Sequence, residues 1–408
     1  MKRIVALLTC ITLTLSLSAQ RLTIGGYGEV AYSRNFYSDN VYRYSRPAEY
    51  AKDPSHGRFD VPHAVIYVGY DFGKGWSMQT EIEFEHTGTG SAVEKEFTEA
   101  GEWETEIEKG GEVELEQFWI QKSFGNAFNI RAGHLVVPVG GLNFEHEPLN
   151  YFSVYRNEGE FTILPSTWHD TGISLWGRSA HWRYELLVTA GMDGFMFDRD
   201  HFVHYGAKSP YEYRVANNLG YAARVDSYSI EGLRVGLSAF YGQAMHNAYP
   251  NDLHNTRYAD VRAHTVLAAL DFSYKSSRLT LRGNADFGYV HDAATLSTVK
   301  RNLSSNNAPY KKTPVGQSAV AAGLEAGYAV IKDLYVFARY DYYDSYIPAP
   351  DQQDYTYTDR HRAAIGINWF PIPQIAVKAE YAHRFLKAPY NDEPAINIGI
   401  TYMAFFKR

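Results

Sequence analysis

The segment from Trp76 to Glu85 reads Trp-Ser-Met-Gln-Thr-Glu-Ile-Glu-Phe-Glu. Its even-numbered positions hold mainly apolar side chains, and its odd-numbered positions hold Ser, Gln or Glu. A β-strand sends successive side chains to opposite faces, so this alternation predicts a strand with one apolar face and one wet face. A tilted strand of about ten residues is also long enough to cross the hydrocarbon layer of a membrane.

The same alternation recurs along the whole chain. It marks sixteen candidate strands, near residues 22–34, 61–72, 76–86, 113–124, 127–137, 168–177, 181–191, 218–226, 232–242, 263–274, 278–290, 317–328, 334–344, 360–370, 374–385 and 394–404. No long helical period separates these segments, which argues against a parallel α/β fold. No fixed sequence repeat indicates a propeller. The sequence therefore predicts an all-β protein.

The connections between these strands differ in length. Seven short connections, rich in the turn residues Gly, Ser and Pro, alternate strictly with eight longer ones. Outer-membrane barrels have short periplasmic turns and long external loops. We therefore expect a 16-stranded antiparallel transmembrane β-barrel with both ends of the chain on the periplasmic side. A secreted β-sandwich or lectin would also alternate, but strand number, loop asymmetry and aromatic residues at apolar strand ends favour the barrel.

The N-terminus indicates export. Residues 1–20 contain a short basic start, an apolar and Thr-rich run and a Ser-Ala-Gln exit, which is the pattern of a secretory signal peptide. The apolar run is too short for a membrane-spanning helix. A lipoprotein signal at Cys10 is disfavoured by Thr9 before it. We expect a signal peptide over residues 1–20 and an outer-membrane barrel over residues 21–408.

Composition excludes several classes of protein. The chain has 33 Tyr, 22 Phe and 7 Trp, too many large apolar side chains for a disordered protein. One Cys excludes a disulfide scaffold. The net charge of −7 gives no basic excess for nucleic acid. We expect no nucleic-acid partner.

The segment 129–144, Asn-Ile-Arg-Ala-Gly-His-Leu-Val-Val-Pro-Val-Gly-Gly-Leu-Asn-Phe, resembles the phosphate-selective porin O/P-like family of Gram-negative bacteria, in which an Arg-x-Gly strand runs into a Pro-x-Gly corner. The stretches 151–156 and 170–175 are also similar to that family. The Ser-Ala-Gln exit followed by Gly25–Glu29 resembles Bacteroidetes porins. The resemblance implies a trimeric channel for small hydrophilic solutes or ions, embedded in outer-membrane lipid.

The connection 138–167 is the third long loop. The resemblance implies that it folds inward and narrows the lumen. A constriction needs charges of chosen sign, and the loop carries five candidates: Glu145, Glu147, Arg156, Glu158 and Glu160. On this interpretation Arg156 lies opposite Glu158 or Glu160 across the pore. The alternative is an exposed loop with solvated charges.

The alternation also predicts which charged residues face the lumen. The basic candidates are Arg131, Arg183, Arg224, Arg234, Arg282, Arg339, Arg362, Lys378 and Arg384. The acidic candidates are Glu29, Glu81, Glu83, Glu85, Glu185, Asp226, Asp271, Asp286, Glu325, Asp341 and Glu380. A phosphate channel should carry a basic excess to attract anions. This set is balanced, so we expect a general or weakly selective porin, with phosphate selectivity as the alternative.

Other chemistry has weaker signals. The loop 94–116 holds ten Glu and two Lys, a pattern typical of a solvated loop, and it lacks the ligand spacing of an EF-hand. The groups Glu145-His146-Glu147 and His201/His204 are interpreted as coincidences of sequence, so we expect no metal and no cofactor. No catalytic motif of a hydrolase, metalloprotease or nucleotide-binding enzyme is present. A non-conducting binding or structural barrel and, more remotely, an outer-membrane hydrolase remain the alternatives to a porin.

Overall fold

The computed structural model describes residues 21–38, 40–52, 57–86, 91–96, 104–109, 112–208, 213–245, 261–302 and 312–407. The expected signal peptide at residues 1–20 lies outside the described residues. No helix among the described residues has the length and the apolarity needed to cross a membrane.

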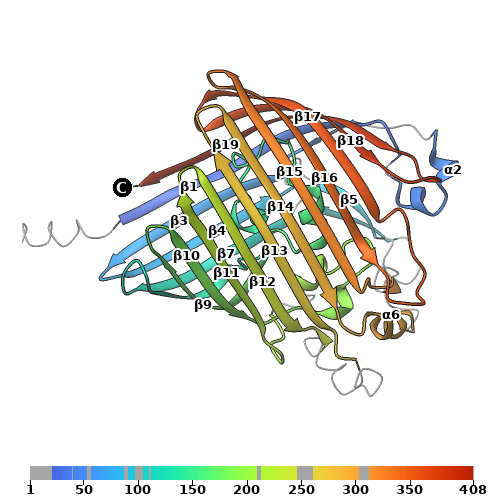
Figure 1. The fold of residues 1–408 in the computed structure, drawn as a ribbon, viewed down its shortest axis with the longest axis horizontal. Coiled ribbons are helices and arrows are strands. Elements are labelled where there is room, and N and C mark those ends of the chain that lie inside the picture. Colours follow the sequence, from blue (N-terminus) through green and yellow to red (C-terminus); the bar gives the residue numbers. More distant parts are fainter. Residues whose placement is uncertain are drawn as a thin grey trace, which may run out of the picture.

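Sixteen long antiparallel strands form one closed sheet (Figure 1). They are β1 (Arg21–Asn35), β3 (His63–Gly73), β4 (Trp76–Glu85), β7 (Glu112–Ser123), β8 (Asn129–Val136), β9 (His169–Arg178), β10 (Trp182–Thr189), β11 (Gly220–Ile230), β12 (Leu233–Gln243), β13 (His264–Lys275), β14 (Leu279–Val290), β15 (Ser318–Ile331), β16 (Leu334–Ile347), β17 (Asp359–Ile372), β18 (Ile375–Phe385) and β19 (Glu393–Lys407). Strand β1 pairs with β3 on one side and with β19 on the other, which closes the barrel. The predicted fold class and all sixteen predicted strands are confirmed.

The short and long connections lie at opposite ends of the barrel. The C-terminus and the short turns lie at the left of Figure 1, while helices α2 (Pro47–Tyr50) and α6 (Ala293–Arg301) lie among the long connections at the right. The further short elements are β2 (Gly57–Asp60), which pairs with β1, and η1 (Val41–Tyr44), α3 (Gly141–Phe144), α4 (Glu158–Ile163), η2 (Gly194–Met196) and η3 (His204–Ala207).

The acidic connection 94–116 departs from the expectation of a loop. Strands β5 (Ser91–Glu96) and β6 (Glu104–Lys109) pair as a separate antiparallel hairpin. This segment also alternates with the period of a β-strand, since Glu104, Glu106 and Glu108 alternate with Thr, Ile and Lys. A run of like charge therefore did not prevent strand pairing here.

The outer surface of the barrel is apolar. On β12, Leu237 is 61% exposed, whereas its neighbour Ser238 is 2% exposed. The same contrast between exposed apolar and buried inward side chains repeats around the sheet. Near the short-turn end, the aromatic side chains on the outer face are about half exposed, as expected for a girdle at a membrane interface: Phe72, Trp76, Tyr328, Trp369 and Tyr402.

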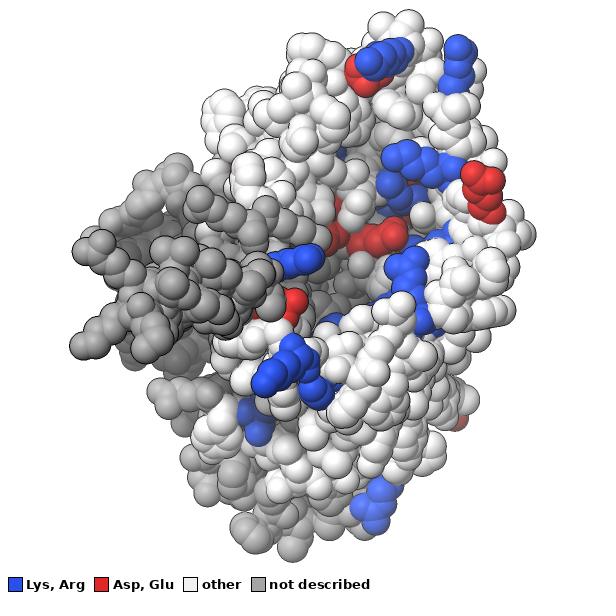
Figure 2. Space-filling view, turned by 90° about the vertical axis from the view of Figure 1, so that its left-hand side faces the viewer, with Lys and Arg blue, Asp and Glu red and all other residues white. Residues whose placement is uncertain are grey.

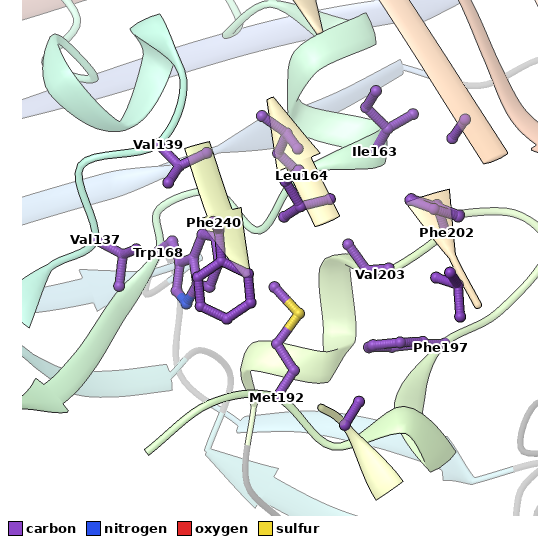
Figure 3. Packing of buried hydrophobic residues seen from close by; sticks show 14 of the residues in the cluster. Val137, Val139, Ile163, Leu164, Trp168, Met192, Phe197, Phe202, Val203 and Phe240 are labelled. Carbon is purple, nitrogen blue, oxygen red and sulfur yellow. The ribbon is translucent and has the colours of Figure 1, made fainter. Parts of the chain in front are cut away.

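Part of the barrel interior is filled by an apolar cluster (Figure 3). The inward-facing Phe240 of β12 packs against Trp168, with ring centroids 4.8 Å apart. Long connections supply most other members, including Leu164, Met192 and Phe202. In this part of the lumen, apolar side chains replace the wet inner face that the alternation predicts. Sequence analysis gave no sign of this cluster, because residues in irregular connections carry no periodic pattern that reveals which side they bury.

Candidate functional site

The connection 138–167 lies inside the barrel. Lys378 of β18 donates hydrogen bonds to the carbonyl oxygens of Pro148, Tyr151 and Ser153 at 2.6, 2.8 and 3.0 Å. Lys378 is buried on the inner face of the sheet, so these bonds draw the loop against the wall. A lysine buried in this way satisfies all three of its donors with backbone acceptors.

Acidic side chains of the wall hold the same part of the loop through its amides. Glu325 of β15 accepts from the backbone amide of Phe152 at 3.1 Å, and Glu380 of β18 accepts from the amide of Val154 at 3.0 Å. The wall residue Arg339 donates to the Ser153 hydroxyl at 2.8 Å. Because the bonds to Glu325 and Glu380 use backbone amides, they fix the path of the chain.

Glu158, at the start of α4, joins the loop to the next part of the wall. Its carboxylate accepts from Arg384 at 2.7 Å and pairs with Arg362 at 3.1 Å, and Tyr343 also donates to it. Burial acts to raise the pKa of Glu158, but Arg384 and Arg362 outweigh burial and hold that pKa at about 2. Glu158 is therefore charged throughout the physiological range.

Glu160 lies in a different environment two residues further on. It is buried and accepts a hydrogen bond from the backbone amide of Leu142 at 2.8 Å, which links α4 to α3. Burial raises the pKa of Glu160 to about 7, and the nearby Asp271 acts in the same direction. The pKa values of Glu158 and Glu160 thus shift in opposite directions, because Glu158 lies between arginines and Glu160 is more deeply buried without one as its nearest partner.

The start of the loop packs on a buried network of charges on β11, β12 and β13. Arg224 pairs with Asp226 at 2.8 Å and with Asp271 at 2.9 Å. Arg234 pairs with the same Asp271, and with Glu145 of the loop at 3.2 Å. The ring of Phe144 lies 4.3 Å from the Arg224 guanidinium and 4.9 Å from that of Arg234. A buried charge network of this kind is stable only while every member keeps its partners.

A cavity of about 850 Å³ lies beside the loop. Acidic side chains reach it from β1, β4 and β7, and basic side chains reach it from β17 and β18: Glu29, Glu85, Glu114, Arg362 and Arg384. The loop contributes Arg156 and Glu158 to its lining, together with Tyr155. This cavity lies toward the long connections. At the opposite, short-turn end the molecule is also hollowed near its centre, with basic side chains around acidic ones (Figure 2). The barrel thus holds a polar cavity on one side and the apolar cluster on the other.

The five loop charges that sequence analysis selected do not share one surface. Arg156 and Glu158 line the cavity, as the predicted opposition across a pore requires. Glu160 and Glu145 instead line a smaller cavity of about 70 Å³ against β13–β16. Glu147 accepts a hydrogen bond from Asn150 at 2.7 Å within the loop. Of the two partners expected for Arg156, only Glu158 shares this cavity with it, because α4 turns Glu160 toward α3. Their opposition across a pore stays a prediction.

Most charged residues expected in the lumen are buried on the inner face. Fifteen of the predicted set are buried, namely Glu29, Glu81, Glu83, Glu185, Arg224, Asp226, Arg234, Asp271, Asp286, Glu325, Arg339, Asp341, Arg362, Lys378 and Glu380. Four others keep partly exposed side chains and form ion pairs, namely Glu85, Arg183, Arg282 and Arg384. Arg131 lies over the rings of Trp119 and Trp176, at 4.4 and 5.3 Å.

Sequence reasoning missed the contribution of histidine. His146 of the loop lies close to Glu81 of β4 and Glu116 of β7, and His169 of β9 lies 3.8 Å from Glu116. These residues are far apart in sequence, and the acidic neighbours of His146 and His169 along the chain are not the carboxylates that they meet in space. The period-two pattern places Glu81 and Glu116 on the inner face but does not show that their strands are adjacent to the loop.

No protein-family model matches the chain. An uncharacterized protein of Aquifex aeolicus (strain VF5) is 26% identical over 394 residues, which cover 94% of this chain and 80% of the relative. The resemblance to the phosphate-selective porin O/P-like family is therefore not supported by a family model.

Solved structures of similar fold are outer-membrane proteins. The outer membrane channel DcaP of Acinetobacter baumannii has a TM-score of 0.56 at 11% identity, covering 95% of this chain and 98% of its own. Salmonella typhi OmpF, solved in complex with daunomycin, has a TM-score of 0.54 at 10% identity, covering 93% and 97%. Pseudomonas putida OprB has a TM-score of 0.53 at 12% identity, covering 97% and 96%. At such identities the likeness concerns the fold alone.

The fold and the outer surface together give the location. A closed 16-stranded sheet leaves no backbone group unpaired at an edge, and its outer face is apolar. Barrels of this kind span bacterial outer membranes. The protein is a bacterial outer-membrane β-barrel.

Proposed function

We propose that the protein is a porin, a water-filled channel for passive diffusion of small hydrophilic solutes and ions. The observation that carries the proposal is the polar cavity of about 850 Å³ between the inner wall and the loop 138–167. A polar cavity inside a closed barrel is filled by water rather than by lipid. DcaP, a protein of similar fold, is described as an outer membrane channel, which is consistent with this proposal.

The proposed channel has weak charge selectivity. Arginines of the inner wall lie in ion pairs with neighbouring carboxylates, and the pairs are Arg183–Glu185, Arg224–Asp226, Arg234–Asp271, Arg282–Glu325, Arg339–Asp341 and Arg362–Glu380. Compensated charges attract neither anions nor cations strongly from solution. We propose that the loop charges Arg156 and Glu158, which line the cavity with one charge of each sign, form the constriction of this path.

Planar-bilayer recording tests the proposal directly. We expect the purified, folded barrel to insert into the bilayer and to increase its conductance in steps. The reversal potential under a KCl gradient should be small. That potential should shrink further as salt rises, because screening weakens the field of the lining charges. Adding phosphate should produce no saturable block. Strong anion selectivity with saturable phosphate block would contradict weak selectivity and support the phosphate-selective alternative.

A non-conducting binding or structural barrel is the second candidate. The apolar cluster around Trp168 and Phe240, which fills part of the interior, favours it. The hydrogen bonds from Lys378, Glu325 and Glu380 that hold the loop 138–167 against the wall also favour a non-conducting barrel. Protein that keeps its β-sheet circular dichroism but shows no conductance would overturn the porin proposal and support this one.

The proposed assembly is a homotrimer. It rests on the resemblance of the segments 129–144 and 151–156 to trimeric porins. Light scattering on detergent-solubilised protein, corrected for bound detergent, should give three chains per particle. A single chain per particle in every mild detergent tried would contradict the trimer.

A further inference from the structure

Two wall carboxylates and one loop imidazole converge inside the barrel. Glu81 of β4, Glu116 of β7 and His146 each offer one ligand atom, and these atoms all lie within 4.8 Å of one another. All three side chains are buried. The group therefore has both the residue types and the proximity that a metal ion requires of its ligands.

The imidazole of this group has a buried nitrogen without a partner. His146 is 5% exposed and its Nε2 has no hydrogen-bond partner among the described residues. Glu116 is 1% exposed, and its carboxylate lies beside those of Glu81 and Glu83. Leaving a buried polar atom unsatisfied is costly. Nε2 of His146 therefore needs a ligand that the described residues do not supply.

The surrounding residues orient the three side chains. Nδ1 of His146 lies 3.4 Å from the carbonyl oxygen of Asn143, which favours a proton on Nδ1 and leaves the lone pair of Nε2 free. Thr167 donates to Oε1 of Glu116 at 2.9 Å, and Gln117 donates to Oε2 of Glu81. Outer contacts of this kind fix the orientation of metal ligands.

Glu83 and Arg156 complete the surroundings of the three residues. Glu83 lies on the same face of β4 and is buried beside Glu81 and Glu116. Arg156 is the buried guanidinium that interacts electrostatically with Glu83 and Glu116.

We propose that Glu81, Glu116 and His146 bind one divalent transition-metal cation of the Zn²⁺ class. The imidazole decides the class, because Ca²⁺ and Mg²⁺ prefer ligand sets made of oxygen alone, whereas Zn²⁺ combines imidazole and carboxylate ligands. His146 lies in the loop 138–167, whereas Glu81 and Glu116 lie in β4 and β7 of the wall. The bound cation would therefore link the loop to these two strands.

Calorimetric titration of the folded full-length barrel with Zn²⁺ in detergent tests this site. We expect one Zn²⁺ per chain for the unmodified protein. The substitutions His146→Ala and Glu116→Gln should each weaken binding by about 10-fold or more, on the scale seen when metal-site residues are removed. Glu116→Gln keeps the side-chain volume, so it tests the ligand without opening a cavity.

A matched variant and a second metal make the result decisive. His181→Ala removes an exposed imidazole in a short turn and should leave Zn²⁺ binding unchanged. Excess Ca²⁺ should not displace Zn²⁺. All variants should keep the circular dichroism of the barrel. The proposal is overturned if the unmodified protein binds no Zn²⁺, if all variants bind it equally, or if Ca²⁺ competes on equal terms.

Discussion

Single buried charges hold the inner wall of this barrel together, and Arg224 shows how. Its guanidinium contacts Asp226, Asp271 and the carbonyl oxygen of Gly140, which accepts at 3.0 Å. Removing one member of such a network leaves the others charged, buried and unpaired. Stability at this position therefore depends on matching charges more than on apolar contact.

We predict that Arg224→Ala lowers the free energy of unfolding by about 3 to 5 kcal/mol, because it leaves two buried carboxylates without this partner. Urea unfolding of the barrel in detergent micelles measures the change. As a control, Arg278→Ala removes an exposed guanidinium in a short turn and should change stability by less than about 0.5 kcal/mol. Equal effects of the two substitutions would contradict the importance of the network.

Glu160 predicts a dependence of stability on pH. Burial raises its pKa in the folded protein to about 7, above the 4.5 that is usual for a glutamate side chain. The folded state thus favours the protonated carboxyl, whose stabilising contribution is fully present below about pH 4.5 and is lost as pH rises through about 7.

The substitution Glu160→Gln isolates this effect, since glutamine keeps an oxygen that can accept from Leu142. Relative to the unmodified protein, we expect this variant to gain stability between pH 5 and pH 8. Urea unfolding of both proteins at the two pH values measures the difference. A difference that is the same at both values would show that Glu160 has the same protonation state in the folded and unfolded protein.

At the scale of elements, the docked loop 138–167 is the part that decides the shape of the interior. Its contacts with β11 to β18 use backbone carbonyls and amides as well as side chains. Such contacts tie the path of the loop to the wall without requiring a particular loop sequence. The loop position therefore depends on a small number of wall residues, of which Lys378 makes the most bonds to the loop backbone.

We predict that Lys378→Met loosens the loop and raises single-channel conductance or its current noise. The substitution removes three hydrogen bonds from a charged donor, which weakens docking by about 2 to 4 kcal/mol. Planar-bilayer recording of the variant beside the unmodified protein measures the change. Lys332→Met, at an exposed position in a short turn, should conduct as the unmodified protein does. Unchanged conductance and noise in Lys378→Met would mean that the loop does not limit the path.

For the whole molecule, the apolar outer belt determines how the barrel lies in the membrane. Leu237, 61% exposed in the middle of β12, faces the lipid. Ile230, 63% exposed at the end of β11, lies near the short-turn edge of the belt. The cost of a charge on the lipid face falls from the midplane of the membrane to its interface.

We therefore predict that Leu237→Arg destabilises the barrel by about 2 to 4 kcal/mol in lipid vesicles, and that Ile230→Arg costs about 1 kcal/mol or less. Folding titrations in guanidinium chloride with vesicles measure both values. If Ile230→Arg were the costlier substitution, the membrane belt would have to lie elsewhere on the barrel.

The sequence by itself determined the barrel, because alternate residues of a strand lie on opposite faces. Their apolar or polar character therefore shows which face meets the lipid and which faces inward. The segment Trp76–Glu85 shows this, and the same period also revealed which charges, such as Arg339 and Asp341, face inward. Alternation is a local property that neighbours along the chain are sufficient to reveal.

Only the tertiary structure decided what fills the interior. The partners of Lys378 and Glu158, the apolar cluster around Trp168 and Phe240, and the meeting of His146 with Glu116 all join residues from separate strands and connections. The physical reason is that an irregular loop has no periodic pattern, so its packing depends on contacts across the lumen that become defined only when the sheet closes.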